Sequence, residues 1–321
     1  MKFVKIEGLQ VYKKPIYVNL ILMSENIPQL TITAPAKINL HLEVKDRRPD
    51  GFHNLESIFL ALNFGDTLYF EPILGKNSVE MAAVEGVGFE ENIIFKALSL
   101  FRGRTGFDQG LKIGVKKRIP IGGGLGGGSS NAASTLLALN KLTGNPLDRA
   151  ALLDMAASLG SDVPFFIHET AAALITGRGE HIEPLTPPNL FFVLVYPGFS
   201  SSTALAFRLL DEYRNHKIIK QRELNGSFSA SAPREPLVRR LCERNFEFFY
   251  NDFLEIFPEH EKNVYYRIIS QLKKLGADFA SLSGAGSTCF GVFNEKESAE
   301  KAAAVLRDKW KFVENSCLIK A

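Results

Sequence analysis

The sequence has few cysteines and no long apolar run. Its three cysteines, Cys242, Cys289 and Cys317, are widely spaced and form no C-x-x-C pair. This spacing argues against a zinc site and for free thiols in a reducing compartment. No apolar run approaches the ~18 residues of a membrane span. Residues 13–23 faintly imitate a signal peptide, but Pro15 and Asn19 interrupt the apolar stretch and no small-residue cleavage site follows. We therefore expect a cytoplasmic protein with no membrane partner.

The excess of positive over negative charge is also small. The 38 Lys and Arg residues and 35 Asp and Glu residues leave a net charge of +3, which is too small to indicate a nucleic-acid surface. The apolar content of 45% and the charged content of 23% are those of an ordinary globular protein. A chain of 321 residues has room for about two domains. This composition suits a protein whose ligands are small anions.

The glycines are concentrated in the stretch Pro120-Ile-Gly-Gly-Gly-Leu-Gly-Gly-Gly-Ser-Ser130. The alternating run 111–119 before it predicts a strand, and the small-residue run 131–142 after it predicts a helix that begins near Ser129. Consecutive glycines allow positive φ angles and close approach to a ligand, and the N-terminus of a helix offers N–H groups to an anion. A loop that only connects elements has no use for six glycines. We therefore predict a phosphate-binding loop.

Three known types of phosphate loop do not fit this stretch. The Walker A pattern fails because Ser, not Lys, follows Gly128. Gly122, Gly124 and Gly127 spell G-x-G-x-x-G, but residues 141–146 read as a turn where a dinucleotide fold needs a second strand. The protein-kinase loop requires Val where Ser129 stands, and no His-Arg-Asp or Asp-Phe-Gly motif follows. The loop is of another kind.

The segment 31–44 alternates strictly between apolar even positions and other residues at odd positions. A period of two predicts a half-buried strand. It places Lys37, Asn39, His41 and Glu43 on one face, with Lys37 and Asn39 about 7 Å apart. A polar strand face is often only solvated, so a functional and a solvent-exposed interpretation both stay open.

A turn and a return strand follow this segment. Asp50-Gly51 predicts the turn, residues 55–62 predict the returning strand, and 66–72 predict another strand. Phe52 and His53 stand beside the turn, either as a base-stacking platform or as ordinary packing.

Asp162 is a second candidate polar residue. It follows a helix predicted over 147–159, which Gly160 is expected to end as a left-handed cap. We expect Asp162 to lie in a short connection between this helix and an apolar strand at 165–167. An Asx turn is the structural alternative to a chemical role.

The remaining segments predict an alternation of strands and helices. Helices are expected at 92–104, 204–214, 246–257, 262–275 and 296–310, a hairpin at 171–185, a strand at 191–196, an exposed loop at 215–237, and a strand, small-residue turn and strand over 279–293. The last part suggests a ferredoxin-like α+β half. The best boundary is the Pro-rich segment 186–188. Residues 3–12 and 16–23 look like strands, without an assignable role.

The motifs together resemble those of the GHMP small-molecule kinases, from about residue 31 to the C-terminus. They are Pro35-Ala-Lys-Ile-Asn-Leu40 with Asp50-Gly-Phe-His53, the loop 120–130 with Asn131-Ala-Ala, and Leu282-Ser-Gly-Ala-Gly286, while Gly160-Ser-Asp-Val-Pro-Phe-Phe166 and Gly177-Arg-Gly-Glu180 also agree. The resemblance implies an α+β fold of two domains with the active site in the cleft between them. Residues 1–186 would form an N-terminal domain of the ribosomal-protein-S5 domain 2 type, with 1–30 as an extension of unknown role. Residues 187–321 would form a ferredoxin-like C-terminal domain.

The long glycine loop and the Pro-Ala-Lys-Ile-Asn motif resemble one branch of this family. That branch uses ATP and Mg²⁺ to phosphorylate the 2-hydroxyl of 4-diphosphocytidyl-2-C-methyl-D-erythritol in the non-mevalonate isoprenoid pathway. The alternatives are another GHMP kinase, of the homoserine or mevalonate type, and a non-catalytic nucleotide-binding sensor on the same fold. The resemblance leaves open whether the protein is a monomer or a homodimer.

The resemblance also implies roles for individual residues. Lys37 and Asp162 match the catalytic pair. Asn39, Phe52 and His53 match substrate contacts, the last two toward the cytosine, and Phe52 departs from the frequent Tyr. Ser129 or Ser130 is expected to help hold Mg²⁺. The residues expected to bind the ATP phosphates are Pro120, Ile121, Gly122, Gly123, Gly124, Leu125, Gly126, Gly127, Gly128, Ser129 and Ser130.

Overall fold

The computed structural model describes residues 3–6, 29–82, 88, 90–224 and 235–320. By their contacts these residues form two compact units. Unit 1 contains the described residues up to Pro35 together with Gly65–Arg118 and Gly127–Glu169, and unit 2 contains Ala36–Phe64, Ile119–Gly126 and the chain from Thr170 onward. The chain therefore passes between the units several times. The boundary expected at residue 186 stays a prediction.

Two long paired strands contribute residues to both units. They are β2 (Leu30–Arg47) and β3 (His53–Lys76), and β3 contains both strands that the sequence predicts at 55–62 and 66–72. The predicted turn between them is confirmed, since Gly51 has a φ of 87° and the Arg48 N–H donates to the Phe52 carbonyl at 2.6 Å. In unit 2, the even-numbered Ile38 and Leu40 join the hydrophobic core, as the alternation predicts.

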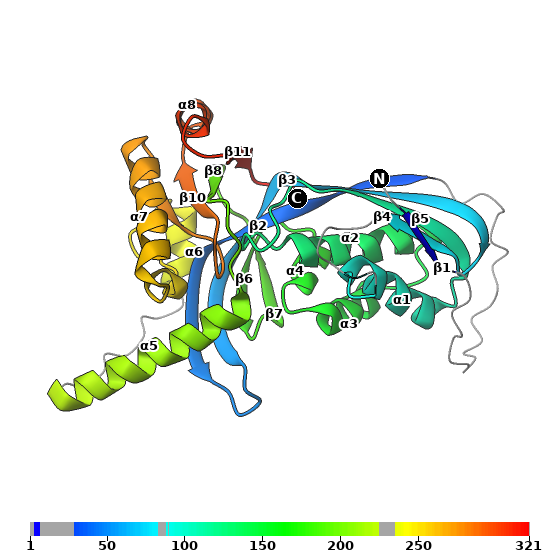
Figure 1. Cartoon of the computed structure of the whole chain (residues 1–321), viewed down its shortest axis with the longest axis horizontal. Coiled ribbons are helices and arrows are strands. Elements are labelled where there is room, and N and C mark those ends of the chain that lie inside the picture. The colour runs from blue at the N-terminus through cyan, green and yellow to red at the C-terminus, as the bar shows by residue number, and fades with distance from the viewer. Residues whose placement is uncertain (1–2, 7–28, 83–87, 89, 225–234, 321) are drawn as a thin grey trace. The chain divides into compact units, whose positions relative to one another are not determined.

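Unit 1 combines a small sheet with four helices. The second half of β3 pairs antiparallel with β5 (Gln109–Lys116), β5 pairs in parallel with β4 (Val79–Ala82), and β4 pairs with β1 (Phe3–Ile6). The helices are α1 (Ile93–Thr105), α2 (Gly127–Leu142), α3 (Arg149–Leu159) and α4 (Val163–Ile167), which Figure 1 shows gathered together. Helix α2 contacts the other three. Its buried face is rich in small residues, which allow this close packing.

The helix predictions in unit 1 are confirmed, but the chain after α3 differs from expectation. Gly160 has a φ of 164°, which is extended backbone, so the predicted left-handed cap is wrong. Residues 165–167 belong to the short helix α4 and not to a strand. Pro164 lies in the first turn of α4, where its fixed φ suits a helix and its missing N–H has no intrahelical partner to lose.

Unit 2 contains a hairpin and a second sheet. The first half of β3 pairs with β6 (Ala172–Gly177), and β6 pairs with β7 (His181–Leu185), which confirms the predicted hairpin. The second sheet is antiparallel in the order β11 (Phe312–Cys317), β8 (Phe191–Tyr196), β10 (Cys289–Phe293) and β9 (Phe279–Leu282). Helix α7 (Glu259–Lys274) packs on β9 and β10, and α8 (Lys296–Arg307) packs on the other strands and β10 (Figure 1).

Two predictions in unit 2 are wrong. Helix α5 (Thr203–Leu224) runs into the loop expected at 215–237, α6 (Glu235–Cys242) begins within it, and residues 225–234 lie outside the described residues. The helix expected at 246–257 is irregular apart from one 3₁₀ turn, η1 (Asp252–Glu255). The Asn251 side chain donates to the carbonyls of Leu282 and Gly284 at 2.7 and 2.9 Å, and these bonds fix a non-helical backbone here.

The N-terminal strand prediction is confirmed only for residues 3–6, and 7–28 lie outside the described residues. The three cysteines carry free thiols. Among the described helices, none combines the length and apolarity that crossing a membrane requires.

Candidate active site

The glycine loop turns its carbonyl groups toward neighbouring elements of unit 2. The carbonyls of Gly122, Gly123, Gly124 and Leu125 accept hydrogen bonds, in that order, from the Ser201 N–H, the Thr288 N–H, the Ser283 hydroxyl and the Lys37 N–H, at 2.9 to 3.1 Å. A trans peptide places its N–H opposite its C=O. The N–H groups of Gly124, Leu125 and Gly126 therefore point away from these partners, which is the arrangement that an anion needs.

The loop approaches its neighbours so closely that side chains would not fit. A Cβ on Gly124, whose φ is 75°, would lie 2.2 Å from the Ser283 carbonyl oxygen. A Cβ on Gly122, whose φ is 67°, would lie 2.5 Å from the Ser200 Cβ. Both positions thus require glycine for conformation and for space.

Helix α2 begins at Gly127, two residues before the expected start, and carries the two serines of the loop. Ser129 is partly exposed and Ser130 is fully buried. Within the described part of the chain, Ser130 Oγ has no hydrogen-bond partner, and the same holds for Thr288 Oγ1 in unit 2. Buried hydroxyls normally find partners. In unit 1, the unpartnered Ser130 hydroxyl beside the partly exposed Ser129 therefore fits the hard cation of a phosphate group, for which a hydroxyl oxygen is a suitable ligand.

The odd-numbered face of β2 is buried at Lys37, Asn39 and His41, so the solvent-exposed interpretation is wrong for these residues. Lys37 is 4% exposed and Asn39 is 3% exposed. The Lys37 ammonium donates to Asn39 Oδ1 at 2.6 Å and lies 4.4 Å from the centroid of the Phe59 ring. The Asn39 amide donates to Ser57 Oγ at 3.0 Å. The Lys37 ammonium is buried and held in place, and the Lys37 backbone N–H also bonds the glycine loop. An ammonium in such a fixed position can stabilise negative charge.

His41 continues this face of β2. Its Nδ1 accepts from the Tyr250 N–H at 3.4 Å, and its ring meets the Tyr250 ring edge-on at 4.6 Å. The pKa of His41 is lowered to about 4, chiefly by burial; Glu43 raises it and Lys45 lowers it by smaller amounts. His41 is therefore neutral at pH 7.

Phe52 and His53 lie differently, although they are neighbours in sequence. Phe52 is half exposed, and the Arg178 guanidinium lies 5.3 Å from its ring centroid. His53 is buried, its Nε2 lies 2.8 Å from Asp211 Oδ1, and its ring stacks on Phe207 at 5.3 Å. An exposed ring next to a positioned imidazole fits a base-recognition role.

Asp162 lies in unit 1, directly before α4, and is partly exposed. Its side chain makes no capping hydrogen bond to α4, which argues against the structural alternative of an Asx turn. Lys37 belongs to unit 2. The pairing of Lys37 with Asp162 stays a prediction.

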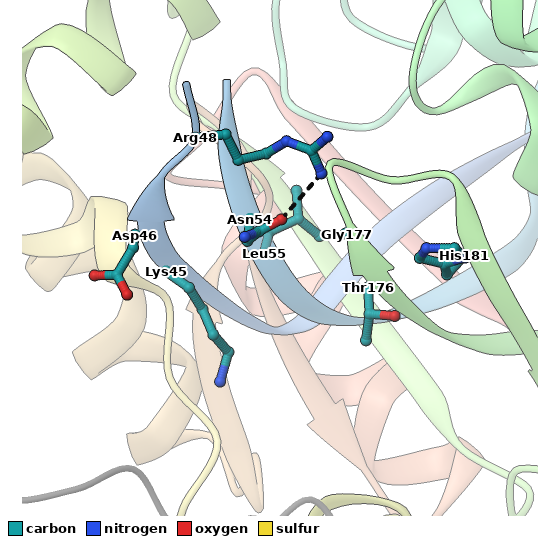
Figure 2. A pocket seen from close by; sticks show the side chains of 8 residues that line it. All are labelled: Lys45, Asp46, Arg48, Asn54, Leu55, Thr176, Gly177 and His181. Atoms are coloured by element: carbon teal, nitrogen blue, oxygen red, sulfur yellow. Dashed lines mark hydrogen bonds between the residues drawn. The ribbon is translucent and has the colours of Figure 1, made fainter. Parts of the chain in front are cut away.

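A pocket of about 400 Å³ lies in unit 2, between the end of the β2–β3 hairpin and the β6–β7 hairpin (Figure 2). Its lining residues are Lys45, Asp46, Arg48, Asn54, Leu55, Thr176, Gly177 and His181. Lys45 pairs with Glu43 at 2.9 Å and Glu56 at 3.5 Å; burial alone would lower its pKa, but these carboxylates raise it. Arg48 contacts Asp50 at 3.1 Å and the Asn54 amide oxygen at 3.3 Å. Because its cations are already neutralised, this pocket is a poor anion site.

Comparisons with known proteins identify the family of this chain. Models of the GHMP kinases N terminal domain and the GHMP kinases C terminal match residues 92–170 and 235–311. The 4-diphosphocytidyl-2-C-methyl-D-erythritol kinase of Thermodesulfovibrio yellowstonii is 36% identical over 288 residues, which cover 88% of this chain and 95% of that protein. The chain belongs to the 4-diphosphocytidyl-2-C-methyl-D-erythritol kinases of the GHMP family.

Solved structures agree with this family. A crystal structure of 4-(cytidine 5'-diphospho)-2C-methyl-D-erythritol kinase superposes with a TM-score of 0.76 at 31% identity, covering 91% of this chain and all of that one. The homoserine kinase of Cytophaga hutchinsonii superposes with a TM-score of 0.63 at 17% identity over 94% of this chain and 97% of its own, and shows the fold alone. The predicted two-domain α+β GHMP fold is confirmed. Kinases of this family use ATP.

Sequence reasoning missed three polar residues around these sites. Ser57 bonds Asn39, Asp211 bonds His53, and Thr288 bonds the glycine loop through its N–H. Ser57 lies on β3, which pairs with β2. A prediction of this pairing from the sequence would have placed Ser57 next to Asn39. Asp211 lies on a helix 158 residues from its partner, and no local pattern points to it.

Proposed function

We propose that this protein transfers the γ-phosphoryl group of ATP to the 2-hydroxyl of 4-diphosphocytidyl-2-C-methyl-D-erythritol, giving the 2-phosphate and ADP in the non-mevalonate isoprenoid pathway. The observation that carries the proposal is the 36% identity over 288 residues to a kinase named for this substrate. The new bond joins the substrate oxygen to phosphorus, the bond from phosphorus to the ADP oxygen breaks, and the hydroxyl proton passes to a base.

The glycine loop and Lys37 are the residues that we assign to the ATP phosphates. Phosphoryl transfer passes through a loose transition state, so catalysis consists of positioning and charge stabilisation. The outward N–H groups of residues 124–126 bind phosphate oxygens. The Lys37 ammonium, held by Asn39 and the Phe59 ring, stabilises charge on the transferred group.

Asp162 is the residue that we assign to the acceptor hydroxyl. A carboxylate accepts hydrogen bonds only, so it can orient the 2-hydroxyl toward phosphorus and take its proton late in the transfer. Its partly exposed position directly before α4 is compatible with this role.

Ser129 and Ser130 are the residues that we assign to Mg²⁺, because the Ser130 hydroxyl is buried without a partner in the described chain and Ser129 is its partly exposed neighbour. Mg²⁺ bound there would offset the negative charge of the phosphates. Among the described residues, no cluster of three or more His, Cys, Asp or Glu side chains suits a metal.

Phe52 and His53 are assigned to the cytosine of the substrate. The exposed Phe52 ring offers a stacking surface, and Asp211 holds the His53 imidazole in place. A cytoplasmic location and a monomeric or homodimeric state complete the proposal.

The test is a coupled ADP-release assay with the purified protein, Mg²⁺-ATP and the diphosphocytidyl substrate, with homoserine and mevalonate as competing acceptors. We expect turnover with the first acceptor only. Absence of that turnover, with homoserine or mevalonate used instead, would overturn the substrate. ATP binding without turnover of any acceptor would favour a nucleotide sensor.

The role of Asp162 is tested by Asp162→Ala. We expect kcat to fall by at least about a hundredfold, while ATP still binds. Asp154→Ala is the matched control, because it removes an exposed carboxylate on α3 of the same unit. If Asp162→Ala turns over like Asp154→Ala, the assignment is wrong.

A further inference from the structure

We infer that Ser57 is a positioning residue for phosphoryl transfer, because its hydroxyl fixes the direction of the Asn39 amide and thereby holds the oxygen of that amide against the Lys37 ammonium. This inference rests on the proposed function for its effect on turnover. Its geometry stands apart from that function. Ser57, Asn39 and Lys37 are all buried in unit 2.

The direction of each hydrogen bond follows from the donor inventory of these groups. The Ser57 hydroxyl donates its single proton to the His41 carbonyl oxygen, which can only accept. Ser57 Oγ therefore meets Asn39 as an acceptor, so the group that faces it must be the NH₂ of the amide. This leaves Asn39 Oδ1 facing Lys37. The Lys37 ammonium can only donate a hydrogen bond, so only one arrangement satisfies all three bonds: Lys37 donates to Asn39, Asn39 donates to Ser57, and Ser57 donates to the His41 carbonyl.

The surroundings of Asn39 leave this amide little alternative. A Cβ on Gly284 would lie 3.4 Å from Asn39 Oδ1, so the backbone of that turn packs against the amide oxygen. The Lys37 N–H bonds the Leu125 carbonyl at 2.9 Å, which ties the base of the lysine to the glycine loop. The position of the Lys37 ammonium relative to bound phosphate thus depends on the hydrogen bonds that run from Lys37 through Asn39 to Ser57.

Removing the Ser57 hydroxyl leaves a buried amide donor without its acceptor. The amide then tilts or rotates, and the ammonium loses a fixed contact on one side. Since charge stabilisation depends on a preorganised donor, the loss falls on the transition state more than on ATP binding. We expect Ser57→Ala to lower kcat about tenfold, which corresponds to about 1.4 kcal/mol, and to leave the KM for ATP within about twofold.

The decisive experiment is a double-mutant cycle of Ser57→Ala and Asn39→Ala in the full-length enzyme, assayed well below the lowest melting temperature of the set. If Ser57 acts through Asn39, Ser57→Ala has less than about a twofold effect on kcat once Asn39 is Ala. Equal losses in both backgrounds, or an unchanged kcat for Ser57→Ala, would overturn the inference. Ser316→Ala is the matched control, since it removes a buried serine hydroxyl that bonds the Asn63 side chain at 2.7 Å.

A second measurement does not depend on turnover. The side-chain NH₂ of Asn39 should give a protected pair of ¹⁵N–¹H signals in the wild-type enzyme, and Ser57→Ala should shift this pair and speed its exchange with water. An unprotected amide in the wild type would refute the geometry. A protected amide in a protein that turns over no diphosphocytidyl substrate would instead contradict the proposed function.

Discussion

Gly124 is the position where a single methyl group should disable the phosphate loop. Its φ of 75° lies in the left-handed region, and a Cβ there would lie 2.2 Å from the Ser283 carbonyl oxygen and 2.8 Å from that of Gly286. Both atoms belong to the backbone, so relief requires the chain to move. We predict that Gly124→Ala lowers both the stability of the fold and the affinity for ATP.

Gly106→Ala separates the cost of a positive φ angle from the cost of the steric clash with the backbone. Gly106 also has a φ of 75°, but nothing lies within 4 Å of a Cβ built on it. It should lose only the conformational term, about 1 to 2 kcal/mol of unfolding free energy. Gly124→Ala should lose the same amount plus about 1 to 3 kcal/mol for overpacking against backbone.

Urea unfolding of the two variants and the wild type measures these free energies, and isothermal titration with Mg²⁺-ATP measures binding. We expect ATP affinity to fall at least about tenfold in Gly124→Ala, equivalent to about 1.4 kcal/mol, and to stay within about twofold in Gly106→Ala. Equal urea midpoints for the two variants, with unchanged ATP binding by both, would refute the steric reasoning.

Three further predictions concern stability and substrate affinity. Burial lowers the pKa of His41 from 6.5 to about 4, so between these pH values the unfolded chain binds a proton that the folded chain does not bind. The folded state is therefore most stable above pH 6.5 and loses stability as the pH falls toward 4. Urea unfolding should show a loss of about 2 kcal/mol between pH 7.5 and pH 5 in the wild type, and this loss should be absent from the His41→Asn variant. Asp148→Ala should cost about 1 kcal/mol, because the carboxylate accepts from the Ala151 N–H at 2.8 Å as the N-cap of α3, and an unchanged thermal midpoint would contradict this. His53→Ala should raise the KM for the diphosphocytidyl substrate and leave that for ATP unchanged; an unchanged substrate KM would argue against the cytosine role.

Local patterns in the sequence predicted the strands and helices whose periodicity is strong. The alternation over 31–44 located β2 and the face shared by Lys37, Asn39 and His41. It could not tell that this face is buried, because the groups that cover it come from elsewhere: Ser57 from β3 and Tyr250 from a segment some 200 residues away. A period of two reports which side chains share a face, and not what lies opposite.

Two errors have different physical causes. The polar character of 215–224 suggested a loop, but the segment contains no Gly or Pro and is rich in good helix formers, so α5 continues through it. The aromatic spacing over 246–257 suggested a helix. There the Asn251 side chain bonds carbonyls more than 30 residues away, and this tertiary contact overrides the local pattern.

In unit 2, residues 120–126 of the glycine loop and the small-residue turn at 283–288 form one structural element, although they are separate motifs in the sequence. The turn supplies the Ser283 hydroxyl and the Thr288 N–H that hold two loop carbonyls, and a Cβ on Gly284 would lie 3.2 Å from the Gly124 carbonyl oxygen. Because these contacts hold the carbonyls on one side, they also direct the N–H groups of residues 124–126 to the other side. The small residues of the turn are thus required for the same reason as the glycines of the loop, because the two backbones must approach each other more closely than side chains allow. A larger residue in either motif should therefore displace the other motif and impair phosphate binding.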